Sequence, residues 1–317
     1  MGRYVARRIL QLVPVFFGAT LILFAMVYVI PGDPVRALFG ERQVPETTLT
    51  ELRDRYNLND PFLVQYAKYM GFMPDDEDGW SGILQGSFGE DFRGREVTEI
   101  IVQRFPPTVR LATGAIIVQA VVGILAGVVA AVRRNSYLDS LVLVSTTLLV
   151  AVPLFVSATA ARLLFGLELG WFPIAGLRNG AWSYALPIIM LASLSLAYVA
   201  RLTRTSMVEN GRADFVRTAR AKGLQRSRVV GRHVLRNSLI PVITFIGIDF
   251  GQLLGGAVIT ETVFNIPGIG RAVFEAVTTQ EGAVVVGIVT LLVLIYLVAN
   301  LVVDVLYGVL DPRIRYE

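Results

Sequence analysis

The sequence predicts an all-α integral membrane protein with six transmembrane helices. Hydrophobic residues make up 54% of the 317 residues, more than the roughly 45–50% of an average soluble domain. They are gathered into six long runs, each near the length of about 20 residues that a helix needs to cross a bilayer. Lysine and arginine are concentrated in alternate connections between the runs, which is typical of the cytoplasmic side of a membrane protein.

Each of the six runs is expected to form one span. The first run follows three arginines, but it is too long for the apolar core of a signal peptide and ends in Pro31-Gly-Asp-Pro without a cleavage site, so it is interpreted as a span. The fourth run is short and is expected to extend into its flanks. In chain order the predicted spans cover residues 9–30, 108–132, 138–164, 186–200, 239–259 and 284–306.

The placement of basic residues predicts that both termini of the membrane protein lie in the cytoplasm. Basic residues precede the first run, follow the second and the sixth, and crowd the connection 201–236, which holds ten of the 29 lysines and arginines. The sequence pI of about 9.5 follows from this bias. It is therefore not interpreted as a sign of nucleic-acid binding.

A large extracytoplasmic loop is expected between the first two spans. It covers residues 31–107 and is long enough to contain structure of its own. Short helices are predicted from Thr50 and over 62–70. The acidic run 75–78 lacks the alternating ligand spacing and distal glutamate of an EF-hand, so it is interpreted as a solvated turn.

These features divide the chain into three predicted parts. The first part is the cytoplasmic N-terminus with the first span, and the second is the extracytoplasmic loop region. The third is a transmembrane core that contains a cytoplasmic loop at 201–237. In order, the three parts cover residues 1–30, 31–107 and 108–317.

The cytoplasmic loop contains a predicted helix with two possible roles. Asp214 suits the start of a helix and Gly223 its end. Phe215, Ala219 and Lys222 are spaced at i, i+4 and i+7, so they share one face. An aromatic residue followed by a small one can enter a groove on another protein. A basic helix can equally lie on anionic lipid, and the spacing leaves both interpretations open.

Enzyme chemistry is disfavoured by composition. The chain has no cysteine and one histidine, His233, which excludes disulfides, thiolate metal sites and cysteine nucleophiles. Neither of its two lysines lies in a Gly-x-x-x-x-Gly-Lys-Ser/Thr phosphate loop, so the chain is not expected to hydrolyse ATP by itself. We predict no catalytic, cofactor-binding or metal-binding residues.

Polar residues inside the spans are the candidates for a translocation pathway. Asp249 lies in the fifth run, and Asn300 and Asp304 lie at i, i+4 in the sixth. An aspartate at a helix centre costs about 2.5–3.5 kcal/mol on insertion scales, so these residues should face a cavity or a partner helix. A structural pair, or a place near the inner interface for Asp304, is the alternative. Gly123 and Gly127 form a Gly-x-x-x-Gly pattern, which favours a helix contact.

Several motifs along nearly the whole chain resemble one family. They are Pro31-Gly-Asp-Pro, Leu52-Arg-Asp-Arg-Tyr with Gln65-Tyr66, Gly86-Ser-Phe-Gly, Gly170-Trp-Phe-Pro, Tyr198-Val-Ala-Arg-Leu-Thr-Arg-Thr-Ser-Met, Asp214-Phe-Val-Arg-Thr-Ala-Arg-Ala-Lys-Gly, Glu261-Thr-Val-Phe-Asn-Ile-Pro-Gly-Ile-Gly and Asp311-Pro-Arg-Ile-Arg. In this order they resemble the permeases of bacterial and archaeal ABC importers. Within these permeases, they resemble specifically the first (B-type) membrane subunit of the dipeptide, oligopeptide and nickel branch.

The resemblance implies a type I ABC importer permease fold and import of peptides, with nickel or heme as alternative cargo. It implies a second homologous permease, ABC ATPase subunits, an extracytoplasmic substrate-binding protein, a peptide substrate and a lipid bilayer as partners, and no nucleic acid. A secondary carrier is only the runner-up class. The predicted spans lack the Glu/His/Asp relay that proton-driven carriers use. A non-transporting scaffold is less favoured.

The resemblance also bears on single residues. The stretch that holds Asp214, Phe215, Ala219, Lys222 and Gly223 resembles the EAA loop, whose coupling helix docks on the ATPase, and this favours docking over lipid binding. The chain departs from the family pattern in three places. These are Gln280-Glu-Gly-Ala before the last span, the acidic insert at 75–78, and Asp249, where the family more often has an uncharged residue.

Overall fold

The computed structural model describes residues 2–28, 45–75, 79–254 and 257–310. The motif at Pro31, residues 76–78 of the acidic run, residues 255–256 of the fifth predicted span and the ending from Asp311 lie outside these ranges. The chain divides into two compact units. We call Thr108–Ile266 with Val298–Glu317 the core unit, and Gly2–Pro107 with Pro267–Leu297 the N-terminal unit.

The N-terminal unit contains the two short helices expected before the second span. One begins at Glu46, ahead of the expected start at Thr50, and the other has the expected bounds. A proline precedes each helix, and its fixed φ suits a helix start. The elements of this unit are α1 (Gly2–Tyr28), α3 (Glu46–Arg55), α4 (Phe62–Met70), a 3₁₀ turn (Ile83–Gln85), the start of α5 (Val97–Val132), α13 (Ile269–Thr278) and the start of α14 (Gly282–Leu310).

Helix α4 links α1 to α14 within the N-terminal unit. Phe24 of α1 is 2% exposed and packs on Tyr66 and Tyr69, with ring centroids 5.6 and 5.4 Å apart. The Tyr69 hydroxyl donates to Thr290 Oγ1 at 2.7 Å. Burial raises the pKa of Tyr69, so the hydroxyl keeps the proton that this bond needs. A buried apolar cluster of α5, α13 and α14 residues, which includes Val97, completes the packing.

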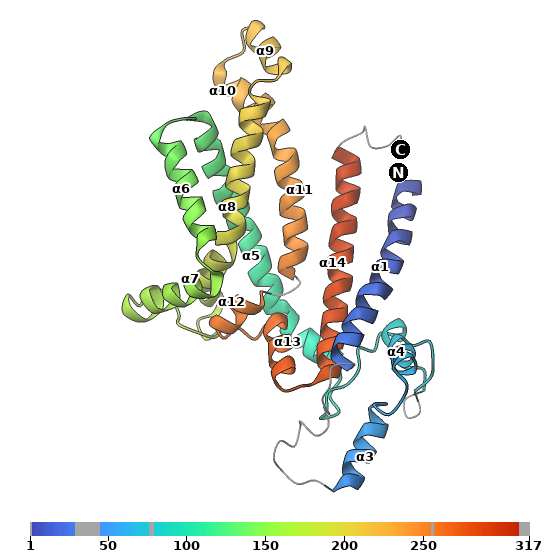
Figure 1. The fold of residues 1–317 in the computed structure, drawn as a ribbon. Helices are drawn as coiled ribbons and strands as arrows, with labels where there is room; N and C mark the ends of the chain where they lie inside the picture. The colour runs from blue at the N-terminus through green and yellow to red at the C-terminus, as the bar shows by residue number, and fades with distance from the viewer. Residues whose placement is uncertain (1, 29–44, 76–78, 255–256, 311–317) are drawn as a thin grey trace. The chain divides into compact units, whose positions relative to one another are not determined.

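The core unit is a bundle in which α8 packs against both α6 and α11, side by side in Figure 1. Its apolar centre joins α5, α7, α8 and α12. The elements are the rest of α5, α6 (Tyr137–Ala151), α7 (Leu154–Ala161), π-helical turns at Arg162–Glu168 and Val229–Val234, a 3₁₀ turn at Gly180–Tyr184, α8 (Ala185–Asn210), α9 (Asp214–Ala221), α10 (Arg226–Arg228), α11 (Leu235–Leu254), α12 (Val258–Val263) and the end of α14.

Five helical segments in the described residues are long and apolar enough to cross a membrane. Helices α6 and α7 add a sixth span only if the two are taken together, because they meet at an angle of 100°. The third expected span, 138–164, is therefore broken and does not form one uninterrupted helix. Val152 is extended (φ −96°, ψ 127°) ahead of Pro153, since the residue before a proline is driven out of helical geometry.

Helices α5 and α8 extend furthest beyond the predicted spans. Helix α5 begins at Val97 and runs through Pro106 and Pro107, whereas the prediction starts the span at Thr108. Helix α8 continues past Ala200 to Asn210, well into the basic loop. Prolines are tolerated in membrane helices because neighbouring groups can satisfy the freed backbone.

The Gly-x-x-x-Gly pattern forms the helix contact that the sequence indicates. A Cβ on Gly127 would lie 2.5 Å from the Ala200 carbonyl oxygen, and one on Gly123 would lie 2.8 Å from Val199 Cγ1. Both neighbours belong to α8. The glycines thus allow α5 and α8 to approach closely, as small residues do in membrane helix pairs.

Candidate functional site

The predicted helix in the basic loop is present as α9. It begins at Asp214 and ends at Ala221, and Gly223 follows with a left-handed φ of +75°. The Gly223 amide donates to the Arg220 carbonyl at 2.9 Å, and the Leu224 amide donates to the Ala219 carbonyl at 3.3 Å. A glycine at this position ends the helix without the steric cost that a Cβ would bring.

The face of α9 that contains Ala219 is turned toward its own chain. Ala219 is 5% exposed and Val216 is 1% exposed, and both pack in a cluster with Met207, Val229 and Val234. This corrects the expectation that Ala219 faces a partner's groove. The buried apolar face of the helix includes Val216, which the predicted face of Phe215, Ala219 and Lys222 did not contain.

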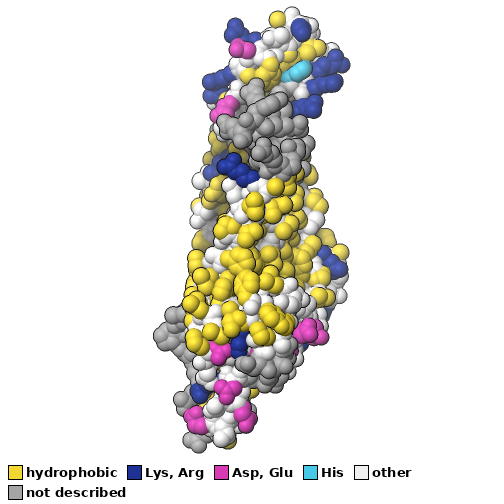
Figure 2. All heavy atoms as spheres, turned by 90° about the vertical axis from the view of Figure 1, so that its right-hand side faces the viewer, with side chains coloured by type: hydrophobic (Ala, Val, Ile, Leu, Met, Phe, Trp, Pro, Cys, Tyr) yellow, Lys and Arg dark blue, Asp and Glu magenta, His cyan; other side chains and the backbone are white. Residues whose placement is uncertain are grey.

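The other predicted coupling residues are exposed. Phe215 is 39% exposed, and Asp214, Lys222 and Gly223 are also at the surface. In Figure 2, Lys and Arg side chains gather at the end of the core unit where α9 and α10 lie. The segment therefore presents one large aromatic side chain in a basic surface.

An ion pair that sequence reasoning did not single out joins α6 to α8. Arg204 donates from Nε to Asp139 Oδ1 at 2.5 Å and from Nη2 to Oδ2 at 2.8 Å. Asp139 is 3% exposed and also accepts the Asn135 amide at 2.9 Å. The available signal was the acid at the start of a span, a few residues after the basic residues Arg133 and Arg134.

Of the predicted pathway residues, Asp249 is buried between three helices. It is 7% exposed. Gln119 Nε2 of α5 donates to Asp249 Oδ2 at 2.6 Å, and Ser195 Oγ of α8 donates to Oδ1 at 3.0 Å. These two hydrogen bonds do not involve Asn300 or Asp304, which are half-buried on α14.

A second buried carboxylate was also missed. Glu261 in α12 is 0% exposed, and its Oε1 accepts a hydrogen bond from Thr108 Oγ1 at 2.6 Å. In the same region Arg162 Nη1 donates to the Val263 carbonyl. Burying a carboxylate is costly without such donors. Its signal in the sequence was an acid directly after the fifth apolar run.

The described residues contain no group of three or more His, Asp or Glu side chains that could hold a metal ion. The arrangement combines a basic helical loop with polar residues enclosed in an apolar bundle. Hydrogen-bonded and close-packed contacts tie the loop-bearing helix α8 to its neighbours α5, α6 and α11. Such a unit can move as one body when the loop is displaced.

Two families of transport components match the sequence. Residues 123–316 match the family described as binding-protein-dependent transport system inner membrane component. Residues 1–112 match the N-terminal membrane component of the same systems. The first match alone covers more than half of the chain.

Curated relatives are similar over the full length of both chains. The di/tripeptide transport system permease protein DppB of Pseudomonas aeruginosa is 38% identical over 345 residues. The dipeptide transport system permease protein DppB of Alkalihalophilus pseudofirmus is 35% identical over 344 residues. The glutathione transport system permease protein GsiC of Escherichia coli K12 is 36% identical over 319 residues. In each case the similarity covers 100% of both chains.

A solved structure supports the fold. The MetNI methionine ABC transporter in an inward-facing conformation matches with a TM-score of 0.53 and 18% identity, over 66% of this chain and 96% of that chain. At this identity the likeness concerns the fold alone, and it confirms the ABC importer permease fold that the motifs imply. Taken with the two family matches and the full-length relatives, it shows that the chain belongs to the inner membrane components of binding-protein-dependent transport systems.

Proposed function

We propose that the chain is the non-catalytic permease subunit of an ABC importer for short peptides and forms the translocation pathway with a second, homologous permease. The observation that carries the proposal is the full-length similarity to permeases named for dipeptides, di/tripeptides and glutathione. The missing phosphate loop supports separate ATPase subunits. Cargo would arrive on an extracytoplasmic substrate-binding protein.

The proposed contact with the ATPase is α9 and the turn that follows it. Asp214, Phe215, Lys222 and Gly223 are exposed and would meet the partner. Ala219 would act from beneath, because its small side chain lets α9 lie close to the Val229 and Val234 cluster. Val216 and Ala219 are buried against the chain itself, so α9 lacks a free apolar face to lay into lipid, and this supports docking on a protein.

The proposed orientation places both termini and the 201–237 loop in the cytoplasm, and the 31–107 region outside. The ten basic residues between Arg201 and Arg236 support it. We retain the division into 1–30, 31–107 and 108–317 as the proposed functional parts. The location is then the plasma membrane, crossed several times.

Three polar residues are proposed to serve the pathway in two ways. Asn300 and Asp304 are half-buried on α14, and we assign them to its lining. Asp249 is held by Gln119 and Ser195, so we assign it the role of fixing α5, α8 and α11 beside the pathway. A carboxylate inside the membrane whose hydrogen-bond donors are neutral costs free energy. Its presence at Asp249 therefore supports a functional role for this residue.

Uptake of labelled cargo by the complete transporter tests the proposal. Vesicles containing both permeases and the ATPases, with the binding protein added, should accumulate dipeptides. A catalytically dead ATPase should abolish this uptake. Uptake of nickel or heme with no peptide uptake would replace the cargo assignment. Peptide uptake that persists with the dead ATPase would instead identify a secondary carrier.

A further inference from the structure

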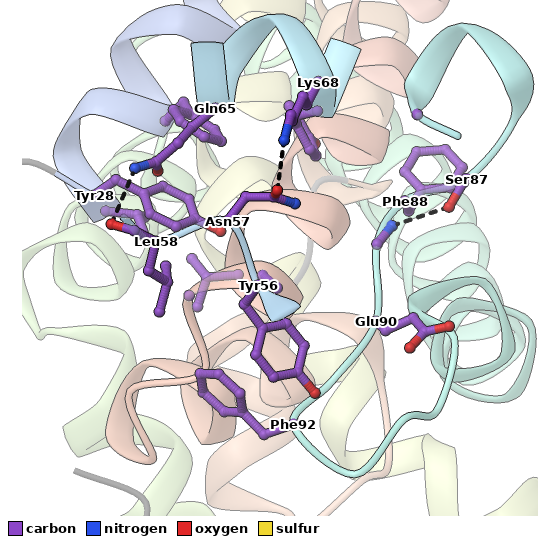
Figure 3. A pocket seen from close by; sticks show the side chains of 18 of the residues that line it. Tyr28, Tyr56, Asn57, Leu58, Gln65, Lys68, Ser87, Phe88, Glu90 and Phe92 are labelled. Carbon is purple, nitrogen blue, oxygen red and sulfur yellow. Dashed lines mark hydrogen bonds between the residues drawn. The ribbon is translucent and has the colours of Figure 1, made fainter. Parts of the chain in front are cut away.

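The N-terminal unit contains a cavity that none of the roles above uses. Its volume is about 740 Å³, within the range of 300–1,000 Å³ that is usual for small-molecule sites. Its walls come from the end of α1, the turn after α3, α4, the loop that follows the 3₁₀ turn, α13 and the start of α14 (Figure 3). All lining residues belong to the N-terminal unit.

Aromatic side chains form much of the wall. Tyr28, Tyr56, Phe88 and Phe92 all line the cavity (Figure 3). Tyr56 and Phe92 meet edge to face with centroids 5.0 Å apart. On the α14 side, the wall includes Ala283, whose small side chain occupies little of the cavity. Aromatic faces attract organic cations as well as apolar groups.

Two carboxylates of the cavity lining are held opposite each other. Glu90 and Glu96 form an antiparallel bridge, and directly opposed residues on paired strands project their side chains to the same face. Glu90 is half-buried and Glu96 is exposed. No described lysine or arginine forms an ion pair with either one. Opposed like charges destabilise a strand pair, so this arrangement favours a cation between them.

The turn between the two glutamates is closed by hydrogen bonds. Asp91 is 2% exposed, and its Oδ1 accepts the Arg93 amide at 2.9 Å and the Arg95 amide at 2.8 Å. The Val97 amide donates to the Gly89 carbonyl at 2.9 Å. These hydrogen bonds hold the backbone that carries Glu90 and Glu96 on opposite sides of the turn.

The single lysine of the cavity does not neutralise the two glutamates. Lys68 is 9% exposed, and its Nζ donates to Asn57 Oδ1 at 2.7 Å and lies 2.9 Å from Asp60 Oδ2. Asp75, the third acid of the lining, accepts from Asn57 Nδ2 at 2.9 Å. Because Asn57 is a neutral donor, Asp75 keeps its charge, and the cavity lining offers a ligand the carboxylates of Glu90, Glu96 and Asp75.

We propose that this cavity binds the protonated amino end of a short peptide. The ammonium group would pair with Glu90 and Glu96, and the first side chain of the peptide would lie against the aromatic walls. Two carboxylates among aromatic rings suit an organic ammonium better than a hard metal ion, which takes six to eight oxygen ligands in the case of calcium. The inference rests on the proposed peptide import and names a part of the cargo that the permease recognises.

Peptide binding to the purified complex of permeases and ATPases, without the binding protein, tests the site. A tritiated dipeptide with a free amino end should bind, and its N-acetylated form should bind at least about tenfold more weakly, since the ion pair is lost. This comparison uses the unaltered protein, so no variant has to fold.

Two variants should reproduce the loss. The double change Glu90→Gln with Glu96→Gln should weaken binding of the free dipeptide by a similar factor and leave binding of the acetylated form unchanged. Ala283→Phe should weaken both forms by filling the cavity. Glu99→Gln is the matched control, because Glu99 is exposed on α5 and does not line the cavity. Subunit stoichiometry of each purified complex shows that assembly is intact.

Several outcomes would overturn the inference. Equal binding of free and acetylated dipeptide is one, and unchanged affinity in the double glutamate variant is another. Loss of binding-protein docking with intact peptide binding would show that the glutamates serve a protein contact. Failure of the proposed function is recognised separately: the unaltered complete transporter would then take up no dipeptide.

Discussion

Asp249 shows at the scale of a single residue how an acid can remain inside an apolar bundle. Its two oxygens accept from Gln119 and Ser195, which belong to two other helices. The hydrogen bonds offset part of the desolvation cost of the carboxylate. They also make the three side chains interdependent, because removal of the acceptor leaves two donors without partners.

Replacing Asp249 by leucine should therefore destabilise the chain more than replacing it by asparagine. Leucine leaves both donors unpaired, at about 1–3 kcal/mol for each buried group, whereas asparagine keeps one acceptor oxygen. Thermal unfolding of the purified transporter in detergent would measure the difference. Ile248→Leu is the control, because Ile248 is 36% exposed on the same helix. A leucine variant as stable as the unaltered protein would contradict this role.

The pair of Asp139 and Arg204 should behave as a unit. Arg204→Ala leaves a carboxylate that is 3% exposed without its counter-ion, and breaking a buried pair in this way costs about 3–5 kcal/mol. Exchanging the two residues (Asp139→Arg with Arg204→Asp) should recover part of that loss. Thermal unfolding of the single variants and the exchange variant measures the coupling. If the exchange is no more stable than Arg204→Ala, the two residues do not act as a pair.

At the scale of elements, α9 combines a buried face with an exposed one. Val216 and Ala219 hold the helix to its own chain, while Phe215 remains 39% exposed. Substitutions on the two faces should thus have different effects. Ala219→Arg should disturb the packing of the loop itself, since an arginine does not fit a site that is 5% exposed.

Phe215→Ala should weaken the ATPase contact and leave α9 folded. Because Phe215 is 39% exposed, enclosing the rest of the ring contributes roughly 0.6–1.2 kcal/mol, that fraction of the value for full burial. Affinity for the ATPase should therefore fall by about three- to eightfold. Co-purification of the ATPase and hydrolysis per transported peptide measure this. Thr218→Ala is the control, because Thr218 is an exposed residue of the same helix. Native transport by the Phe215 variant with the ATPase still bound would exclude α9 as the coupling element.

At the scale of the whole molecule, the chain depends on partners for energy. The sequence contains no phosphate loop, and α9 is the proposed place where movement of an ATPase reaches the spans. Transport would then require the helices to move as rigid bodies. The close contact of α5 with α8 would let these two helices move together.

The purified chain alone should show no ATP hydrolysis above that of empty membranes. Hydrolysis should appear when the ATPases are added, and the binding protein with its cargo should stimulate it. Release of phosphate, measured for the chain and for the complete complex, checks both statements. Saturable hydrolysis by the chain alone would show that it holds a nucleotide site of its own.

The sequence by itself determined the features that depend on neighbouring residues. The length and hydropathy of the runs predicted membrane helices, because the bilayer sets a span of about 20 residues. Helix signals at Asp214 and Gly223 predicted α9, and the glycine spacing at Gly123 and Gly127 predicted a close helix contact.

Only the tertiary structure determined which side of each helix is buried and which helices pack or hydrogen-bond together. The burial of Ala219 depends on Val229 and Val234, which a later turn brings beneath α9. The donors to Asp249 come from positions 54 and 130 residues away. The bend after Val152 follows from a local rule for proline, but its angle of 100° is a property of the folded core unit. Periodicity describes one element at a time, whereas burial and hydrogen bonding depend on which elements meet.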